Sequence, residues 1–395
     1  MNIIFYRYRS ICEPDYIDAF KSMGLDIIEN DDGMKSDISL DDKINHLGAQ
    51  ILDKSPLFVF SINYYPFISM ICEKMHVFYL SVTVDCPVFE IFNTTIKNKF
   101  NRIFLFDRAQ YEMIKDENPG CIFYLPLGGA VDRVNALLDG VSEYKYDVSF
   151  VGSLYNEKDP LENTKILSDK TIGRIDNAIK CQMEGNVFGC EELSLRISDE
   201  IVEEIKNSYS SFYPSDMSVR DISRYVAVSD YVCPHMTYKE RVKILNRLSE
   251  KCSMPIHLFT SSRSNEISKG VRIHGAVDSL KEMPLVFRQS RINLNITTRS
   301  IQSGLSQRVW DVLACGGFLI TNYQPEIEDL FIEGEHLVTY RSYDELVEKV
   351  NYYLNHDEER QAIADKGYEL VRQSGKVIDR TIEMIRIITE GNRGR

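Results

Sequence analysis

The sequence predicts an α/β protein built from two Rossmann-like, doubly wound domains. Short apolar segments of strand length alternate with helical segments along most of the chain, a pattern typical of βαβ units and parallel sheets. The chain has 395 residues, a length that favours two domains over one. The alternation is interrupted at about residues 160–230 by a long helical region. We therefore expect two parallel sheets, a helical insertion, and a ligand cleft to which both domains contribute.

The first domain is predicted to span residues 1–140. Its expected strands are residues 3–6, 26–28, 57–62, 77–82, 103–106 and 121–124, with helical patterns such as 40–52 and 67–75 between them. Turn and charged residues gather in the stretch 132–146. We place the domain boundary there.

The second domain is predicted to span residues 141–374, with the helical insertion inside it. Its expected strands are 147–151, 256–260, 271–274, 292–296, 318–321 and 337–340, and the last 50 residues are expected to be helical. Within the insertion, apolar residues recur at every fourth position and predict one amphipathic helix. These residues are Leu193, Ile197, Ile201 and Ile205.

The most informative stretch of the second domain is residues 303–321, SGLSQRVWDVLACGGFLIT. An apolar stripe predicts one buried helix face, formed by Leu305, Val309, Val312 and Leu313. The pair Gly316-Gly317 is expected to end this helix, because a residue with positive φ is useful there. The segment 318–321 would then be a short buried strand.

The polar residues of the same helix point to a phosphate ligand. A helix that opens with Ser303 and Gly304 offers backbone N–H groups and a positive dipole end, which suit an anion. Arg308 and Asp311 lie three positions apart on another face, where they are also placed to form a simple ion pair. An acidic residue two turns into the helix can reach sugar hydroxyls. These features indicate a nucleotide-sugar site.

Bulk composition narrows the classes of partner. The formal net charge of −13 makes a nucleic-acid partner unexpected, because phosphate backbones require a basic surface. Nine scattered cysteines without a Cys-x-x-Cys pair favour reduced thiols. The first residues, MNIIFYRYRS, do not resemble a signal peptide, and no run of about 18 apolar residues predicts a transmembrane helix. We therefore expect a cytoplasmic protein.

Several chemistries lack their sequence signatures. The chain has no Asp-x-Asp motif, and its seven histidines do not pair at ligand spacing. It also has neither a Gly-x-Gly-x-x-Gly fingerprint after a strand nor a phosphate-binding loop that ends in Gly-Lys-Ser/Thr. We expect no metal and no resident cofactor.

The C-terminal half resembles the CgeB-like, spore-maturation-protein type of GT-B glycosyltransferase over roughly residues 241–372. The segments that carry the resemblance are RINLNITTRSIQSGLSQRVWDVLACGGFLITNYQPEIEDLF and GEHLVTYRSYDELVEKVNYYLNHDEERQAIADKGYELV. The N-terminal half is similar more loosely, in VTVDCPVFE, RIFLFDRAQYEMI and YLPLGGAVD. The helical region 160–230 has no counterpart.

The resemblance implies the GT-B fold and metal-free transfer of a sugar from a nucleoside-diphosphate sugar. It implies that Asp311 binds the ribose, that Ser303, Gly304 and Leu305 meet the diphosphate, and that Arg308 stabilises its charge. Many retaining relatives carry two glutamates eight positions apart, but Ser303 occupies the earlier position here. The stereochemical outcome is therefore open. The resemblance also implies that residues 375–395 cross back to complete the first domain.

Further candidates for the donor site lie at strand ends and on one helix. Gly152 and Ser153 follow a strand and would let a phosphate approach closely, or they form an ordinary turn. Gly275 likewise follows an expected strand, and the resemblance implies that the loop there binds the base of the nucleotide. Asn295 is a pocket residue or a cap for the next turn, and Arg299 is a phosphate ligand or a solvated side chain.

The segment CPHMTYKERV places His235, Tyr238 and Arg241 at the start of a helix. Arg241 would neutralise a diphosphate. We interpret His235 as a helix-entry residue without chemistry.

Asp85 is the candidate base on the acceptor side. It follows the strand YLSVTV and precedes Cys86-Pro87, so its carboxylate would lie at a strand end, where a general base is useful. The alternative is a turn aspartate bonded to its own backbone. Asp107, in FLFDRA, is interpreted as a helix N-cap.

These observations predict a glycosyltransferase with a protein or polysaccharide acceptor. The alternatives are a GT-B-fold sugar-nucleotide epimerase and a degenerate member that binds a sugar nucleotide or a partner without turnover. Product analysis separates the three. The sequence does not identify the donor base, the sugar or the oligomeric state.

Overall fold

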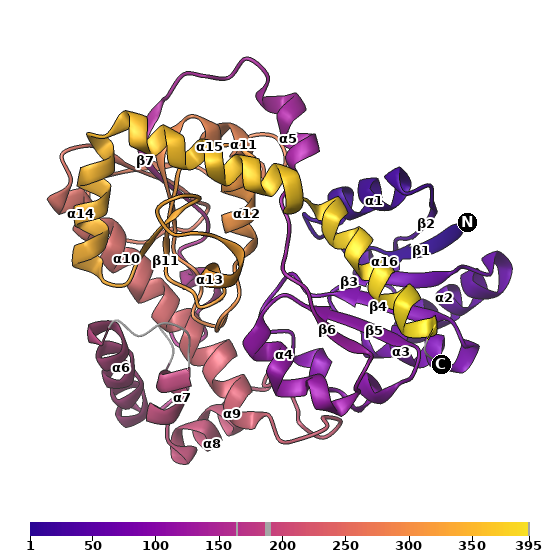
Figure 1. The fold of residues 1–395 in the computed structure, drawn as a ribbon. Helices are drawn as coiled ribbons and strands as arrows, with labels where there is room; N and C mark the ends of the chain where they lie inside the picture. The colour runs from indigo at the N-terminus through magenta and orange to yellow at the C-terminus, as the bar shows by residue number, and fades with distance from the viewer. Residues whose placement is uncertain (163–164, 186–190, 394–395) are drawn as a thin grey trace. The chain divides into compact units, whose positions relative to one another are not determined.

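The computed structural model describes residues 1–162, 165–185 and 191–393. The chain forms two compact α/β units (Figure 1). The first contains residues 1–128, 215–221 and 375–395, and the second contains residues 129–214 and 222–374. Each unit has one six-stranded sheet in which every pair of neighbours is parallel. The predicted fold class is confirmed.

The first sheet has the strand order β2-β1-β3-β4-β5-β6. Its strands are β1 (Asn2–Tyr6), β2 (Asp26–Asn30), β3 (Phe58–Ile62), β4 (Phe78–Val82), β5 (Asn101–Leu105) and β6 (Ile122–Tyr124). The helices between them are α1 (Glu13–Ser22), α2 (Leu40–Lys54), α3 (Pro66–Met75) and α4 (Arg108–Ile114). The six strands lie where the apolar segments predict them.

The last helix, α16 (Val377–Arg393), belongs to the first unit and packs against α1 (Figure 1, yellow). Val377, Met384 and Ile388 are buried in the same cluster as Phe5 and Phe60. These three apolar residues of α16 are thus removed from water, whereas Ile382 on the same helix is exposed. Both ends of the sequence contribute to one hydrophobic core.

A loop of the helical insertion also joins the first unit. The backbone N–H of Thr94 donates to Met217 O at 2.8 Å, and that of Val219 donates to Phe92 O at 2.8 Å. Arg220 donates to Glu117 Oε1 at 2.9 Å. The chain therefore passes between the units four times, at 128/129, 214/215, 221/222 and 374/375.

The second sheet has the strand order β12-β11-β10-β7-β8-β9. Its strands are β7 (Tyr146–Val151), β8 (Ile256–Phe259), β9 (Val271–His274), β10 (Ser290–Asn295), β11 (Leu319–Asn322) and β12 (Val338–Tyr340). The α-helices of this unit outside the insertion are α5 (Val131–Leu138), α10 (Cys233–Lys251), α11 (Met283–Arg288), α12 (Gln307–Ala314), α13 (Ile327–Leu330), α14 (Tyr343–Leu354) and α15 (Asp357–Ser374).

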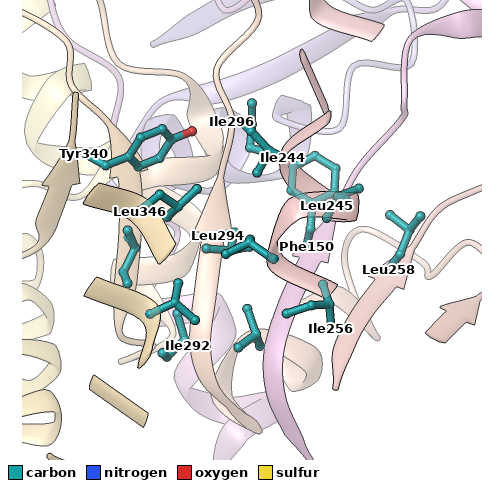
Figure 2. Packing of buried hydrophobic residues seen from close by; sticks show 14 of the residues in the cluster. Phe150, Ile244, Leu245, Ile256, Leu258, Ile292, Leu294, Ile296, Tyr340 and Leu346 are labelled. Atoms are coloured by element: carbon teal, nitrogen blue, oxygen red, sulfur yellow. The ribbon is translucent and has the colours of Figure 1, made fainter. Parts of the chain in front are cut away.

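The core of the second unit lies between the sheet and the helices that cover it (Figure 2). Phe150 and Leu294 come from the central strands β7 and β10, and Ile244 and Leu245 come from the long helix α10 (Cys233–Lys251). Leu346 of α14 packs into the same cluster. Continuous apolar strands are typical of a parallel sheet covered on both faces.

The described part of the insertion is helical. It contains α6 (Asp169–Glu184), α7 (Glu191–Arg196), α8 (Asp199–Ser208) and α9 (Ser223–Val226), and a π-helical turn (Ala227–Val232) leads into α10. The predicted single helix over 193–205 is wrong, although its four apolar residues are buried. Ser198 interrupts it with extended backbone, φ −76° and ψ 160°, and becomes the N-cap of α8.

The observed boundary differs from the predicted one. The units divide between Gly128 and Gly129, so α5 belongs to the second unit. A Cβ on Gly129 would lie 2.9 Å from atoms of both Ala314 and Val371. This tight packing brings the second unit's first residue against α12 and α15. None of the helices in the described residues is both long and apolar enough to cross a lipid bilayer.

Candidate functional site

Arg241 lies where two central strands of the second sheet end. Its guanidinium donates to Ser153 O and to Ile296 O, each at 2.6 Å, so it ties the loop after β7 to the loop after β10. It also lies 4.7 Å from the centre of the Tyr155 ring. Burial lowers the pKa of Arg241. The arrangement holds one cationic group at the carboxyl edge of the sheet.

Ser153 meets Arg241 through its backbone carbonyl, but a carboxylate lies beside its side chain. Gly152 has φ +155°, and its N–H donates to Phe259 O at 3.0 Å. The Ser153 hydroxyl donates to Glu157, whose other oxygen accepts from Ser262 at 2.8 Å. Burial acts to raise the pKa of Glu157, but hydrogen bonds from the two serines lower it overall. The Ser153 hydroxyl, which the sequence predicts to lie near a phosphate, is therefore already bonded to the Glu157 carboxylate.

Asn295 links the ends of β10 and β11. Its Nδ2 donates to Thr297 Oγ1 at 3.0 Å and to Thr321 Oγ1 at 2.9 Å. Its Oδ1 accepts from Ser306 at 3.5 Å. The side chain is buried, so in this structure Asn295 organises the loops at the strand ends.

The donor helix begins later than the sequence predicts. Helix α12 starts at Gln307, with Ser306 as its N-cap. Ser303 lies in the preceding loop, where its hydroxyl donates to Glu326 Oε1 at 2.7 Å. Gly304 accepts from Gln324 at 3.3 Å, and Leu305 is buried. These contacts hold 303–305 as a loop, so the predicted helix opening at Ser303 is wrong.

The other features of this helix agree with the sequence prediction. Val309, Val312 and Leu313 are buried. Gly316 has φ +66°, the left-handed conformation that ends a helix. A Cβ on Gly317 would lie 2.8 Å from Asn293 Nδ2. The double glycine therefore serves both the helix end and the close packing on β10.

Arg308 and Asp311 form the predicted ion pair, with Nη1 3.4 Å from Oδ2. Gln307 donates to Asp311 Oδ1 at 3.0 Å. The Arg308 guanidinium lies 5.0 Å from the centre of the Phe287 ring. Burial lowers the pKa of Arg308, although Asp311 opposes this effect. The pair thus faces α11.

Asp311 also lines a small pocket between α5, α11 and α12. The other residues that line it are Ala130, Arg133, Val134, Ser279, Met283, Pro284, Phe287, Ala314 and Cys315. Its polar residues Arg133, Ser279 and Asp311 come from α5, the loop before α11, and α12. A ligand that reached Asp311 here would therefore meet a cationic side chain, Arg133, and a hydroxyl, Ser279.

Gly275 lies apart from Arg241 and Asn295. It follows β9, the edge strand of the second sheet, and is exposed. A Cβ there would meet no heavy atom within 4 Å. The space beside Gly275 is therefore open.

The second unit contains a buried ionic network, formed by Arg299, Glu240 and Tyr343, that the sequence did not predict. Arg299 and Glu240 form a two-point ion pair, with Arg299 Nε donating to Glu240 Oε2 at 2.8 Å. Tyr343 donates to Glu240 Oε1 at 2.9 Å. Burial acts to lower the pKa of Arg299, but Glu240 raises it overall. The expectation of a solvated Arg299 is therefore wrong, because the side chain is buried and held by Glu240.

His235 lies near the start of α10, as predicted, but it has specific partners. Its Nδ1 lies 2.6 Å from Asp159 Oδ2, and its Nε2 lies 3.2 Å from Asp176 Oδ1. The Tyr238 hydroxyl lies 2.8 Å from Ser264 Oγ. These contacts tie α10 to the insertion and to the loop after β8. Among the residues that the structure describes, no His, Cys, Asp and Glu side chains cluster in a metal-binding group of three or more.

In the first unit, Asp85 follows β4 and is exposed. Its Oδ2 accepts from Asn63 Nδ2 at 2.8 Å. Asp107 caps α4, because its Oδ1 accepts from the backbone N–H of Gln110 at 3.2 Å. The N-cap interpretation of Asp107 is confirmed. The bond from Asn63 was missed, since nothing in the sequence pairs residues that follow different strands.

Comparison with known proteins agrees with this architecture. Residues 241–386 match a family model described as "Glycosyl transferase-like". This segment contains Arg241, Asn295 and all of α12. No curated protein sequence matches the chain.

Solved structures match over nearly the whole length. A sucrose-phosphate synthase from Thermosynechococcus elongatus is 8% identical with a TM-score of 0.53, and the match covers 100% of both chains. A glycosyltransferase from Rickettsia africae is 9% identical with a TM-score of 0.50, over 100% of this chain and 99% of that one. Anabaena HepE in complex with UDP-glucose is 10% identical with a TM-score of 0.50, over 99% and 100%. The chain has the GT-B fold.

Proposed function

We propose that this protein is a glycosyltransferase that moves a sugar from a nucleoside-diphosphate sugar to a protein or glycan acceptor. The observation that carries the proposal is the family match over 241–386, which includes the helix α12 with Arg308 and Asp311. The GT-B fold supports it, since HepE has this fold and is seen with UDP-glucose. The order of motifs in the C-terminal half supports a place in the CgeB-like group.

We propose that the second unit binds the donor. Asp311 would exchange its bond from Gln307 for bonds from the ribose hydroxyls. Arg241 and Arg308 would stabilise the diphosphate as its negative charge develops, because fixed charges in a buried site need little reorganisation. Ser153 is a poor phosphate contact while Glu157 holds its hydroxyl.

We propose that Asp85 of the first unit accepts the proton of the acceptor hydroxyl. The acceptor oxygen then forms a bond to the anomeric carbon, the bond from that carbon to the diphosphate breaks, and the electron pair leaves with the diphosphate. This scheme inverts the anomeric centre. A product with retained configuration would assign Asp85 to acceptor binding instead.

The test is a panel of nucleoside-diphosphate sugars with candidate glycan and protein acceptors, with and without EDTA. We expect release of nucleoside diphosphate together with a glycosylated product, at equal rates in both conditions. An isomerised donor would identify an epimerase. Binding of a donor without turnover would identify a non-catalytic member. Loss of activity in EDTA that manganese or magnesium restores would overturn the metal-free part of the proposal.

A further inference from the structure

We infer that Asn63 is a positioning residue, which holds the Asp85 carboxylate in the orientation that meets the acceptor hydroxyl. This inference rests on the proposed transferase function. It adds a residue that neither the sequence pattern nor the family match brings into the site. Both residues lie at strand ends of the first sheet.

Asn63 and Asp85 follow neighbouring strands. Strands β3 and β4 pair in parallel, with Ile62 opposite Val82, so residues just beyond them lie at the same edge. Asn63 Nδ2 donates to Asp85 Oδ2 at 2.8 Å, and Asn63 Oδ1 accepts from the backbone N–H of Val84 at 3.1 Å. One amide therefore holds both the carboxylate and the backbone that leads to it.

The backbone of Asn63 is itself fixed. Its N–H donates to Val82 O at 2.7 Å, and its carbonyl accepts from Ser61 Oγ at 2.7 Å. Its φ is +57°, a left-handed conformation that asparagine tolerates better than most residues. Such conformations persist where the surroundings determine them strongly, and they gather at functional sites. This backbone conformation sets the direction of the Asn63 side chain at the end of β3.

The same amide contacts a tyrosine. Asn63 Nδ2 lies 3.0 Å from the Tyr8 hydroxyl oxygen, so Tyr8 accepts there and keeps its own proton to donate. Burial and the Asp85 carboxylate raise the pKa of Tyr8, which keeps the phenol neutral. The nearby Glu13 accepts from the backbone N–H groups of Tyr8 and Ser10. Glu13 is buried and Asp85 is exposed, so Asp85 is the carboxylate of the two that an acceptor can reach.

The bond from Asn63 leaves the second oxygen of Asp85 for the acceptor. A hydrogen bond to a charged group is stronger than one between neutral groups, so it favours one carboxylate rotamer over its alternatives. Without it, Asp85 would sample several orientations on an exposed turn. Fewer acceptor encounters would then have the geometry that proton transfer needs.

The informative variant is Asn63→Asp. It keeps the Oδ1 that accepts from Val84 and tolerates positive φ, but it replaces the donor to Asp85 with a second carboxylate. We expect kcat at neutral pH to fall about 10- to 100-fold, which corresponds to the loss of one charged hydrogen bond. The acid limb of the pH–rate profile should move to higher pH, because neighbouring carboxylates retain a proton more strongly. Donor affinity should not change.

The matched control is Asn118→Asp in the same unit. Asn118 also donates through Nδ2, but its acceptors are Ile96 O at 2.7 Å and Asn98 O at 2.9 Å rather than Asp85. This variant should lower stability and leave the pH–rate profile in place. A wild-type rate and profile for Asn63→Asp would overturn the inference while the transferase proposal stands. Absence of transfer by the unmodified protein, with every donor and acceptor, would overturn both.

Discussion

The strands of both sheets end in polar side chains, but the two sets differ in charge and in burial. In the first unit, Tyr8 and Tyr65 lie with ring centres 6.0 Å apart, and Asn63 contacts both Tyr8 and the exposed Asp85. In the second unit, Arg241 and Arg299 are buried. The first edge carries aromatic rings and the exposed Asp85, whereas the second holds Arg241 on two backbone carbonyls and Arg299 paired with Glu240.

This difference suits two different substrates. Buried cations favour a diphosphate, because the low-dielectric surroundings strengthen each interaction. An edge with an exposed carboxylate such as Asp85 favours a neutral hydroxyl that must lose a proton. In the proposed function, binding energy therefore comes mainly from the second unit and proton transfer from the first, and the following variants test that division.

The largest effect is expected for Asp85→Asn. The amide cannot accept the acceptor's proton, so transfer should fall by about 10²- to 10⁴-fold. Donor affinity should be unchanged, since a base acts in the chemical step. Calorimetric titration of donor and a product assay measure the two quantities. Full turnover by this variant would leave Asp85 as a turn residue.

Glu240→Ala should have a large effect on the stability of the second unit. Removal of one partner from a buried ion pair leaves an uncompensated charge and costs about 3–5 kcal/mol. Trp310 is the chain's single tryptophan and is buried in α12, so its fluorescence during urea unfolding reports on this unit. The control is Glu369→Ala, which removes an exposed partner of Arg372 and should leave the free energy of unfolding almost unchanged, because solvent screens exposed ion pairs.

A double variant sharpens this result. Glu240→Leu with Arg299→Met removes both charges, and it should recover much of the lost stability, because a buried ion pair is costly to desolvate. If the double variant is as unstable as Glu240→Ala, the ionic network stabilises the unit through more than charge pairing.

An intermediate effect is expected for Asp311→Ala. Loss of hydrogen bonds from the ribose hydroxyls to a carboxylate, worth roughly 1.5–3 kcal/mol, should weaken donor binding about 10- to 100-fold. Because Asp311 also pairs with Arg308, Trp310 fluorescence should be used to show that the variant is folded. Unchanged donor affinity in a folded variant would restrict Asp311 to its ion pair.

The smallest effect is expected for Gly275→Ala. The added methyl meets no heavy atom within 4 Å, so stability should change by less than about 0.5 kcal/mol. The contrasting variant is Gly317→Ala, whose methyl would lie 2.8 Å from Asn293 Nδ2 and should destabilise the second unit. A large loss of donor affinity for Gly275→Ala alone would indicate that the loop after β9 contacts the donor.

Local patterns predicted the fold well. Strand positions follow apolar runs that parallel sheets require on both faces, and the end of α12 follows from Gly316. Arg308 and Asp311 lie three positions apart, so their ion pair could also be predicted. These features depend on residues close together in the sequence.

The missed features depend on distant residues. Glu240 and Arg299 come together only because α10 packs beside the end of β10, and Ser303 leaves the helix because Glu326 and Gln324 hold its loop. Ser198 was overlooked because an apolar period continues across it, although serine is a common N-cap. Asn63 and Asp85 meet through strand order, which a single sequence does not specify.

The repeated passage of the chain between its units has a consequence for proteolysis. A cut between residues 128 and 129 would release no isolated unit, since the C-terminal fragment still carries 215–221 and 375–395 of the first unit. Met384 and Ile388 would remain buried with Phe5 and Phe60, so the two fragments should migrate as one species until a denaturant separates them. Residues 1–128 expressed alone would lack helix α16 and would expose the apolar surface that this helix covers.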